Sequence, residues 1–127
     1  MRDIAMLIMA CKQLLELKTP FSVEYRVKLK GSNKDSAGYC SEIRRKGVLK
    51  KFRMVINCTG MIESDYDSFS VIAHEMVHAK MMEHEIHDCN YHHNTVFQDI
   101  CRELEKELRK AKFPLTCPLY NPATDTT

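Results

Sequence analysis

Several features that would assign a class of protein are missing from this chain of 127 residues. No stretch approaches the roughly 20 consecutive apolar residues of a membrane-spanning helix, so we expect no membrane-embedded segment. No secretory signal is recognisable either, because Asp3 stands where positive charge belongs and the apolar stretch before Cys11 is too short. The six cysteines include no C-x-x-C pair, which argues against a zinc ribbon and against a disulfide framework. We therefore expect reduced thiols and a cytoplasmic protein.

The composition that remains is typical of one globular domain, with 44% hydrophobic and 28% charged residues. The net charge of +2 is unevenly spread: residues 22–53 hold ten Lys or Arg against three Asp or Glu, whereas residues 54–127 hold six against twelve. The basic segment 22–53, with Tyr25, Tyr39 and Phe52 among its charges, is a candidate DNA-binding surface. A solvated sheet face explains the same composition.

The apolar spacing predicts a single α+β domain over residues 1–112. The predicted elements are a helix over 3–18, strands over 21–29, 37–44 and 51–58, a helix over 66–83 and a last helix over 95–111. We expect an antiparallel-type three-stranded sheet, a turn at Arg45-Lys46-Gly47, and a capping-box-like start at Ser64-x-x-Asp67 for the helix over 66–83. Three prolines then predict an extended, partly mobile tail over 113–127.

The run His74-Glu75-Met76-Val77-His78 lies within the helix predicted over 66–83. Positions i and i+4 share one helical face, so His74 and His78 can both present a ring nitrogen to one metal ion. Glu75 lies about 100° further round the helix and can hold a water over that ion. This is the H-E-x-x-H signature of zinc hydrolases, in which the glutamate acts as general base. An ordinary amphipathic helix with two surface histidines would fit the same five residues.

A catalytic zinc usually has three protein ligands and one open position for water. The candidates for the third ligand are His84, His87, Asp88, Cys89, His92, His93 and Glu103. His84 would need a glycine at position 81 to turn the chain, but Met81 favours continued helix, on which His84 lies about 240° from His78. His87 is half a turn away by the same count. We therefore expect the third ligand from a separate element, and His93, just before the last predicted helix, is placed to reach across.

HEMVHA at residues 74–79, with H-N-x-x-F beginning at His93, resembles the SprT-like zinc metalloproteases, which include the Spartan group of DNA–protein crosslink proteases. Upstream, Ala37-Gly38-Tyr39-Cys40 and Arg53-Met54-Val55-Ile56-Asn57 resemble two strands of that family. The resemblance thus covers about residues 20–112. Asn94 stands where the family has glycine, and both residue types tolerate unusual backbone angles and cap helices.

The resemblance implies a compact zincin-like protease domain in which His74, His78 and His93 bind Zn²⁺ and Glu75 is the catalytic acid and base. The expected function is that of a zinc-dependent endopeptidase that hydrolyses protein or peptide substrates, with DNA-bound proteins as one substrate class. His92 stays open as the third ligand in place of His93. Candidates for stabilising the oxyanion are Tyr66, Tyr91 and His92.

Two other interpretations stay open. Peptide deformylases also use H-E-x-x-H but take a cysteine as third ligand from an upstream strand, here Cys40 or Cys58, and the E-G-C-[LI]-S context of those enzymes is missing. A non-catalytic DNA- or protein-binding module would hold a structural zinc with a fourth protein ligand, either His92 or Cys89. The sequence leaves the oligomeric state open.

Overall fold

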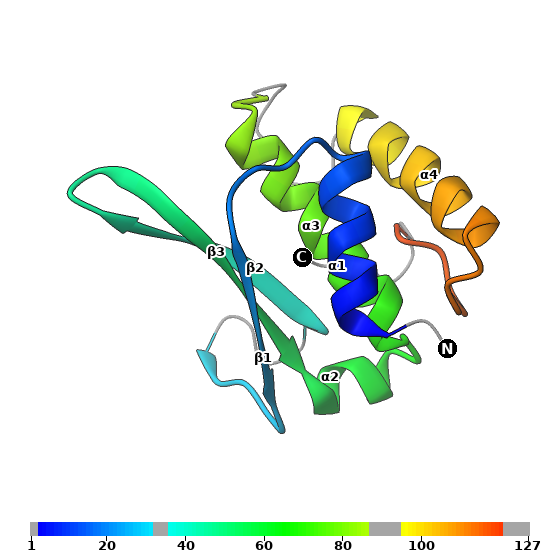
Figure 1. Ribbon diagram of the computed structural model, residues 1–127. Coiled ribbons are helices and arrows are strands. Elements are labelled where there is room, and N and C mark those ends of the chain that lie inside the picture. The colour runs from blue at the N-terminus through cyan, green and yellow to red at the C-terminus, as the bar shows by residue number, and fades with distance from the viewer. Residues whose placement is uncertain (1–2, 32–35, 87–94, 121–127) are drawn as a thin grey trace.

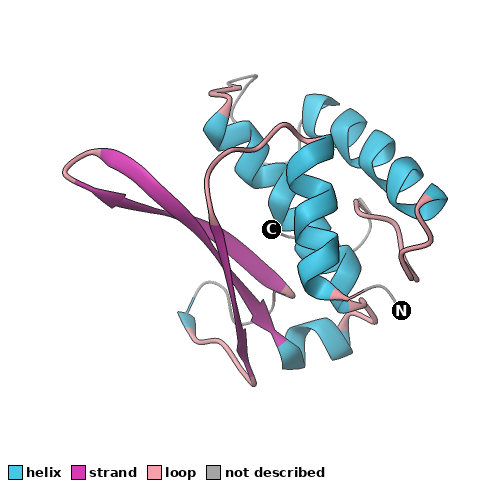
Figure 2. Cartoon of the chain, viewed as in Figure 1, coloured by secondary structure: helices cyan, strands magenta, loops and turns pink. Residues whose placement is uncertain are grey.

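The computed structural model describes residues 3–31, 36–86 and 95–120. Its elements are α1 (Ile4–Leu14), β1 (Phe21–Arg26), β2 (Gly38–Arg45), β3 (Val48–Asn57), α2 (Cys58–Glu63), α3 (Ser68–Glu83) and α4 (Thr95–Lys110). The sheet forms one layer and the long helices lie on one side of it (Figures 1 and 2). Helix α3 contacts β2 and β3 on its sheet side, and α1 and α4 elsewhere.

The predicted α+β class and element order are confirmed, apart from the additional helix α2. No described helix is both long and apolar enough to cross a membrane.

The sheet is mixed, and the expectation of an antiparallel-type sheet is wrong for one strand pair. The strand order is β1-β3-β2, with β1 parallel and β2 antiparallel to the central β3. Alternation of apolar residues predicts which side chains share a face, but the strand direction is set by the connections. The chain between β1 and β3 makes a crossover that contains β2. The turn joining β2 to β3 is confirmed: Lys46 and Gly47 both have positive φ, as a two-residue type I′ hairpin requires.

Helix α1 ends at Leu14, earlier than the predicted residue 18. Its N-terminus is capped by Asp3, whose carboxylate accepts a hydrogen bond from the Met6 N–H at 2.8 Å. At the other end Glu16 adopts the left-handed conformation with φ of 55°, and the N–H of the next residue, Leu17, donates to the Lys12 carbonyl at 2.8 Å. A helix end is usually recognised in a sequence by glycine at this position. Glu16 gives no such signal, which explains why the predicted helix is too long.

Helix α3 begins at Ser68, and its cap is Asp67 rather than the predicted Ser64. The Asp67 carboxylate accepts hydrogen bonds from the Ser70 N–H at 3.0 Å and the Ser70 hydroxyl at 2.6 Å. Ser64 instead caps the end of α2, whose Gly60 packs so tightly that a Cβ there would lie 2.2 Å from the Ser36 carbonyl oxygen. This tertiary contact explains why local sequence did not predict α2.

Glu83, the last residue of α3, holds the loop between α1 and β1. Its carboxylate accepts hydrogen bonds from the Thr19 N–H at 2.8 Å and the Lys18 N–H at 3.0 Å. Burial by itself would raise the pKa of Glu83, but the hydrogen bonds from Thr19 and Lys18 outweigh it, so the pKa lies below the ordinary glutamate value. The charged carboxylate therefore stabilises the folded state.

We expect Glu83→Ala to lower the free energy of unfolding by about 1 kcal/mol at pH 7, because the partly buried Thr19 N–H and the exposed Lys18 N–H lose a charged acceptor. A depressed folded-state pKa gives stability that is complete above the ordinary value of 4.5 and is lost as pH falls through the folded value. Urea unfolding at pH 7 and in acid should therefore show the difference from wild type shrinking in acid. Glu103→Ala, at an exposed position of α4, is the control. A difference that stays constant with pH would contradict the prediction.

Candidate metal centre

The H-E-x-x-H run lies in the most buried part of α3 rather than on the protein surface. His74 and Glu75 are 6% and 2% exposed, and His78 is half-buried. The centroids of the two imidazole rings are 5.0 Å apart, so both rings lie on one face of the helix as their spacing predicts. The interpretation as an amphipathic helix with two surface histidines is therefore wrong for His74.

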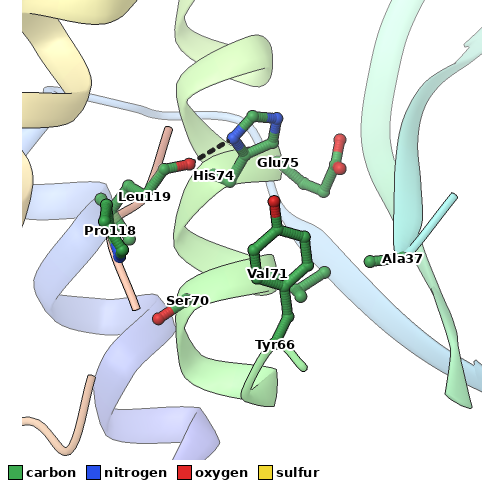
Figure 3. A pocket seen from close by; sticks show the side chains of 8 residues that line it. All are labelled: Ala37, Tyr66, Ser70, Val71, His74, Glu75, Pro118 and Leu119. Atoms are coloured by element: carbon green, nitrogen blue, oxygen red, sulfur yellow. Dashed lines mark hydrogen bonds between the residues drawn. The ribbon is translucent and has the colours of Figure 1, made fainter. Parts of the chain in front are cut away.

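The ring of His74 is oriented by a backbone carbonyl from the end of the described chain. Its Nδ1 lies 2.6 Å from the Leu119 carbonyl oxygen (Figure 3). A carbonyl oxygen can only accept, so Nδ1 carries the proton and Nε2 is the nitrogen that can bind a metal. Metal-binding histidines commonly donate their second ring N–H to a carbonyl or carboxylate in this way.

Phe97 packs against both imidazoles from α4. Its ring centroid lies 5.1 Å from that of His74 and 4.4 Å from that of His78. Phe97 is fully buried and anchors the start of α4 in the core. Helix α4 therefore begins beside the two histidines, which is where the sequence places its candidate third ligand.

A small pocket opens beside the two motif residues His74 and Glu75. Its lining residues are Ala37, Tyr66, Ser70, Val71, His74, Glu75, Pro118 and Leu119. In Figure 3 the Tyr66 hydroxyl points towards the space between the His74 ring and the Glu75 carboxylate. Of the three oxyanion candidates, Tyr66 is the one within the described residues, and it lines this pocket. An imidazole, a carboxylate and a phenol thus meet at one cavity.

The third ligand predicted from the sequence, His93, lies outside the described residues, and so does its alternative His92. Within residues 3–31, 36–86 and 95–120, no three His, Cys, Asp or Glu side chains come close enough to hold a metal ion. His84 follows α3 directly, and its Nε2 lies 3.0 Å from the Glu16 carbonyl oxygen, away from the two motif histidines. The identity of the third ligand stays a prediction.

Cys40 and Cys58, the third-ligand candidates of the deformylase interpretation, do not complete a metal site with the two histidines. Cys40 lies on β2 near Glu75. Burial, and then the negative charge of Glu75, raise the pKa of the Cys40 thiol. A metal ligand must be a thiolate, so this environment favours a neutral side chain at Cys40 in the metal-free protein.

The two motif histidines and Glu75 fit zinc. His74 can present Nε2 to a metal because its Nδ1–H is hydrogen-bonded to the Leu119 carbonyl, and His78 lies beside it on the same helical face. Two imidazoles from the described residues leave two positions of a tetrahedral ion for a further protein ligand and a water. Glu75, one position after His74, is buried at the same pocket.

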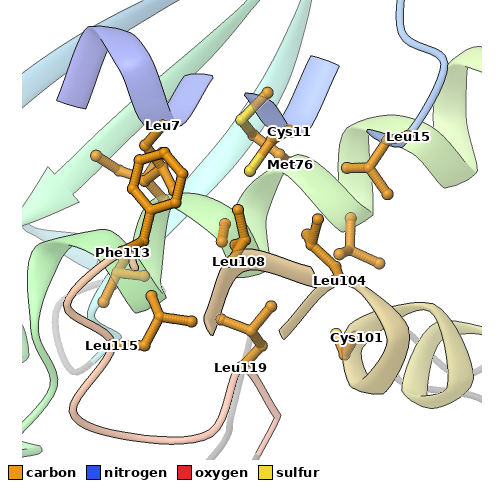
Figure 4. Packing of buried hydrophobic residues seen from close by; sticks show 14 of the residues in the cluster. Leu7, Cys11, Leu15, Met76, Cys101, Leu104, Leu108, Phe113, Leu115 and Leu119 are labelled. Atoms are coloured by element: carbon orange, nitrogen blue, oxygen red, sulfur yellow. The ribbon is translucent and has the colours of Figure 1, made fainter. Parts of the chain in front are cut away.

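The sequence predicts a tail over 113–127 outside the domain, but the structure packs residues 113–120 onto the domain core. Phe113, Leu115 and Leu119 are 5%, 6% and 3% exposed and lie against Leu108 and other residues of the helices (Figure 4). The prolines exclude helix here as expected. Apolar residues between prolines were the signal that could have predicted this burial, and the role of Leu119 beside His74 was missed with it.

The basic segment is less uniform than its composition indicates. Phe52 is fully buried and stacks on Phe21 at 5.2 Å between ring centroids, so it is not a candidate for stacking on bases. Tyr25 remains 48% exposed. Arg44 is held by the Glu42 carboxylate at 2.6 Å, whereas the cations Arg45, Lys46, Lys50 and Lys51 are exposed on the β2–β3 hairpin.

Comparisons with protein-family models, with curated proteins and with solved structures found no match to this chain. Its function is therefore inferred from the geometry of the site and from the resemblance of its motifs.

Proposed function

We propose that this protein is a zinc-dependent endopeptidase with a zincin-like domain of the SprT type. The observation that carries the proposal is the orientation of His74 by the Leu119 carbonyl, next to His78 on the same helical face and to the buried Glu75. The hydrogen bond to the Leu119 carbonyl selects the tautomer in which Nε2 of His74 is the possible metal ligand, and His74 lines the same pocket as Glu75. Hydrolysis of a peptide bond is the chemistry for which two imidazoles and one carboxylate are suited.

In this proposal His74, His78 and His93 hold the metal. A zinc ion bound there would acidify a water and polarise a carbonyl group. Glu75 acts as general base when it accepts the proton of the attacking water. It then acts as general acid when it donates that proton to the leaving amine. The Tyr66 hydroxyl donates a hydrogen bond to the carbonyl oxygen as negative charge develops on it.

The exposed cations of the β2–β3 hairpin support an extension of the proposal to DNA-bound proteins as substrates. Phosphates would be contacted by Arg45, Lys46, Lys50 and Lys51. No disulfide joins the five cysteines within the described residues, which agrees with the cytoplasmic compartment that we propose.

The metal requirement is tested by proteolysis of a basic DNA-binding protein, with and without single- or double-stranded DNA. We expect cleavage that stops when 1,10-phenanthroline removes zinc and returns when zinc is added, because Glu75 alone cannot activate water sufficiently. Cleavage products are followed by electrophoresis and mass spectrometry. Faster cleavage with DNA would support the extension to DNA-bound substrates, and its loss on replacing Arg45 and Lys46 by Glu would assign it to the hairpin. No cleavage by the zinc-loaded protein under any of these conditions would overturn the proposal.

A further inference from the structure

The backbone of Leu119 joins α4 to the candidate metal centre on α3. Its N–H donates to the Glu105 carboxylate of α4 at 2.9 Å, and its carbonyl accepts from His74 Nδ1 at 2.6 Å. One residue thus connects a carboxylate to an imidazole through its own two backbone groups. We propose that Glu105 is a positioning residue for His74, acting through Leu119. This inference rests on the proposed function, in which His74 binds zinc.

The segment that contains Leu119 is held at both ends, and Glu105 holds the end nearer the site. At the far end Asp67 accepts hydrogen bonds from the Thr116 N–H at 3.1 Å and its hydroxyl at 2.9 Å. The Leu119 side chain is 3% exposed and packs in the core, which limits sideways movement but does not fix the direction of the carbonyl. The hydrogen bond that the Leu119 N–H donates to Glu105 fixes the peptide unit before Leu119 and so restricts where the Leu119 carbonyl can point.

Arg109 completes the link between α4 and this segment. Its Nε donates to Glu105 at 3.2 Å, and its guanidinium also donates to the Leu115 carbonyl at 2.9 Å. Glu105 and Arg109 therefore bind the segment through both kinds of backbone group. Glu105 accepts a hydrogen bond from the Leu119 N–H, and Arg109 donates one to the Leu115 carbonyl. The pair with Arg109 favours the side-chain conformation in which the Glu105 carboxylate reaches Leu119.

The position of the Leu119 carbonyl decides which ring nitrogen of His74 is available to bind a metal ion. With the Leu119 carbonyl in place, the proton stays on Nδ1 and Nε2 is available to a metal. If the carbonyl turns away, the proton of the neutral ring can occupy either nitrogen, and the fraction of protein ready to bind metal falls. Loss of such a supporting contact typically lowers metal affinity by about 10–100-fold.

The first experiment reads the tautomer of His74 in metal-free protein at pH 8, from long-range ¹H–¹⁵N spectra of ¹⁵N-histidine-labelled samples, assigned with His74→Asn. We expect the Nδ1–H form in wild type and a mixture in Glu105→Ala. Glu105→Gln should keep the wild-type form, because its amide oxygen still accepts from the Leu119 N–H. Glu107→Ala is the matched control, since Glu107 lies on the same helix and pairs with Lys110 at 3.5 Å. An unchanged His74 tautomer in Glu105→Ala would overturn the inference.

The second experiment measures zinc affinity by competition with a chromophoric chelator. We expect weaker binding for Glu105→Ala, by at most the roughly 10–100-fold that follows loss of a direct partner of a metal ligand, and near-wild-type binding for Glu105→Gln and Glu107→Ala. If Glu105→Ala does not fold, as judged by circular dichroism, Glu105→Asp replaces it, because its carboxylate is one methylene too short to reach Leu119. Equal zinc affinity in wild type and the folded variant would overturn the inference. Absence of zinc binding by wild type would instead overturn the proposed function, while the tautomer spectra would still test the role of Glu105.

Discussion

Replacing Glu75 by glutamine should lower kcat for peptide hydrolysis by a factor of about 10²–10⁴ while leaving bound zinc unchanged. Glutamine has the shape of glutamate but cannot accept the proton of the attacking water at neutral pH. Glu75 is 2% exposed, so bulk water should not replace it in the role of base that we propose for it. Because His74 and His78 are untouched, the proposed site should still bind zinc. The measurement is kcat with the same protein substrate, together with zinc content by elemental analysis.

The matched control for Glu75→Gln is Glu83→Gln, the same change near the end of the same helix. Its amide oxygen can still accept from the Thr19 N–H, and it lies away from the candidate pocket, so kcat should equal that of wild type. Full activity in Glu75→Gln would show that another group moves the proton. If neither wild type nor Glu75→Gln is active, and four protein ligands hold the zinc, the non-catalytic module is favoured instead.

Much of this fold follows from local patterns, and the exceptions come from contacts between distant residues. Helix α4 was predicted to one residue because its buried stripe, Phe97, Cys101, Leu104 and Leu108, recurs at helical spacing. The parallel pairing of β1 with β3 was missed, since alternation carries no information about strand direction. Helix α2 was missed because its position depends on Gly60 packing against the Ser36 carbonyl.

The candidate site likewise has a part that local sequence predicts and a part that depends on a residue distant in the chain. His74, Glu75 and His78 could be placed on one helix from their spacing alone, because an α-helix fixes the angle between neighbouring positions. The contribution of Leu119 could not, because a backbone carbonyl has no signature in the sequence and its partner lies 45 residues away. The prolines around Leu119 indicated an end of helix, and only the structure places that segment in the core.

Phe97→Ala should have the largest effect on stability of any substitution near the site. We expect a loss of about 3–5 kcal/mol in the free energy of unfolding, out of a total of about 5–15 kcal/mol for a domain of this kind. Phe97 is fully buried and contacts both motif imidazoles and Tyr120, so its removal leaves a cavity at the junction of α3, α4 and the C-terminal segment. Urea unfolding of the metal-free protein measures this loss.

The same substitution should weaken zinc binding, because the rings of His74 and His78 lose the surface against which they pack. Phe69→Ala is the control: Phe69 is half-buried and lies against Phe113, at 6.4 Å between ring centroids, rather than against the imidazoles. It should cost less stability and leave zinc affinity unchanged. Phe97→Leu, which restores most of the lost volume, should recover most of the stability. If Phe97→Ala and Phe69→Ala bind zinc equally well, Phe97 serves the core alone. A selective loss of affinity in Phe97→Ala would instead support a metal centre whose histidines are held in place from the first turn of α4.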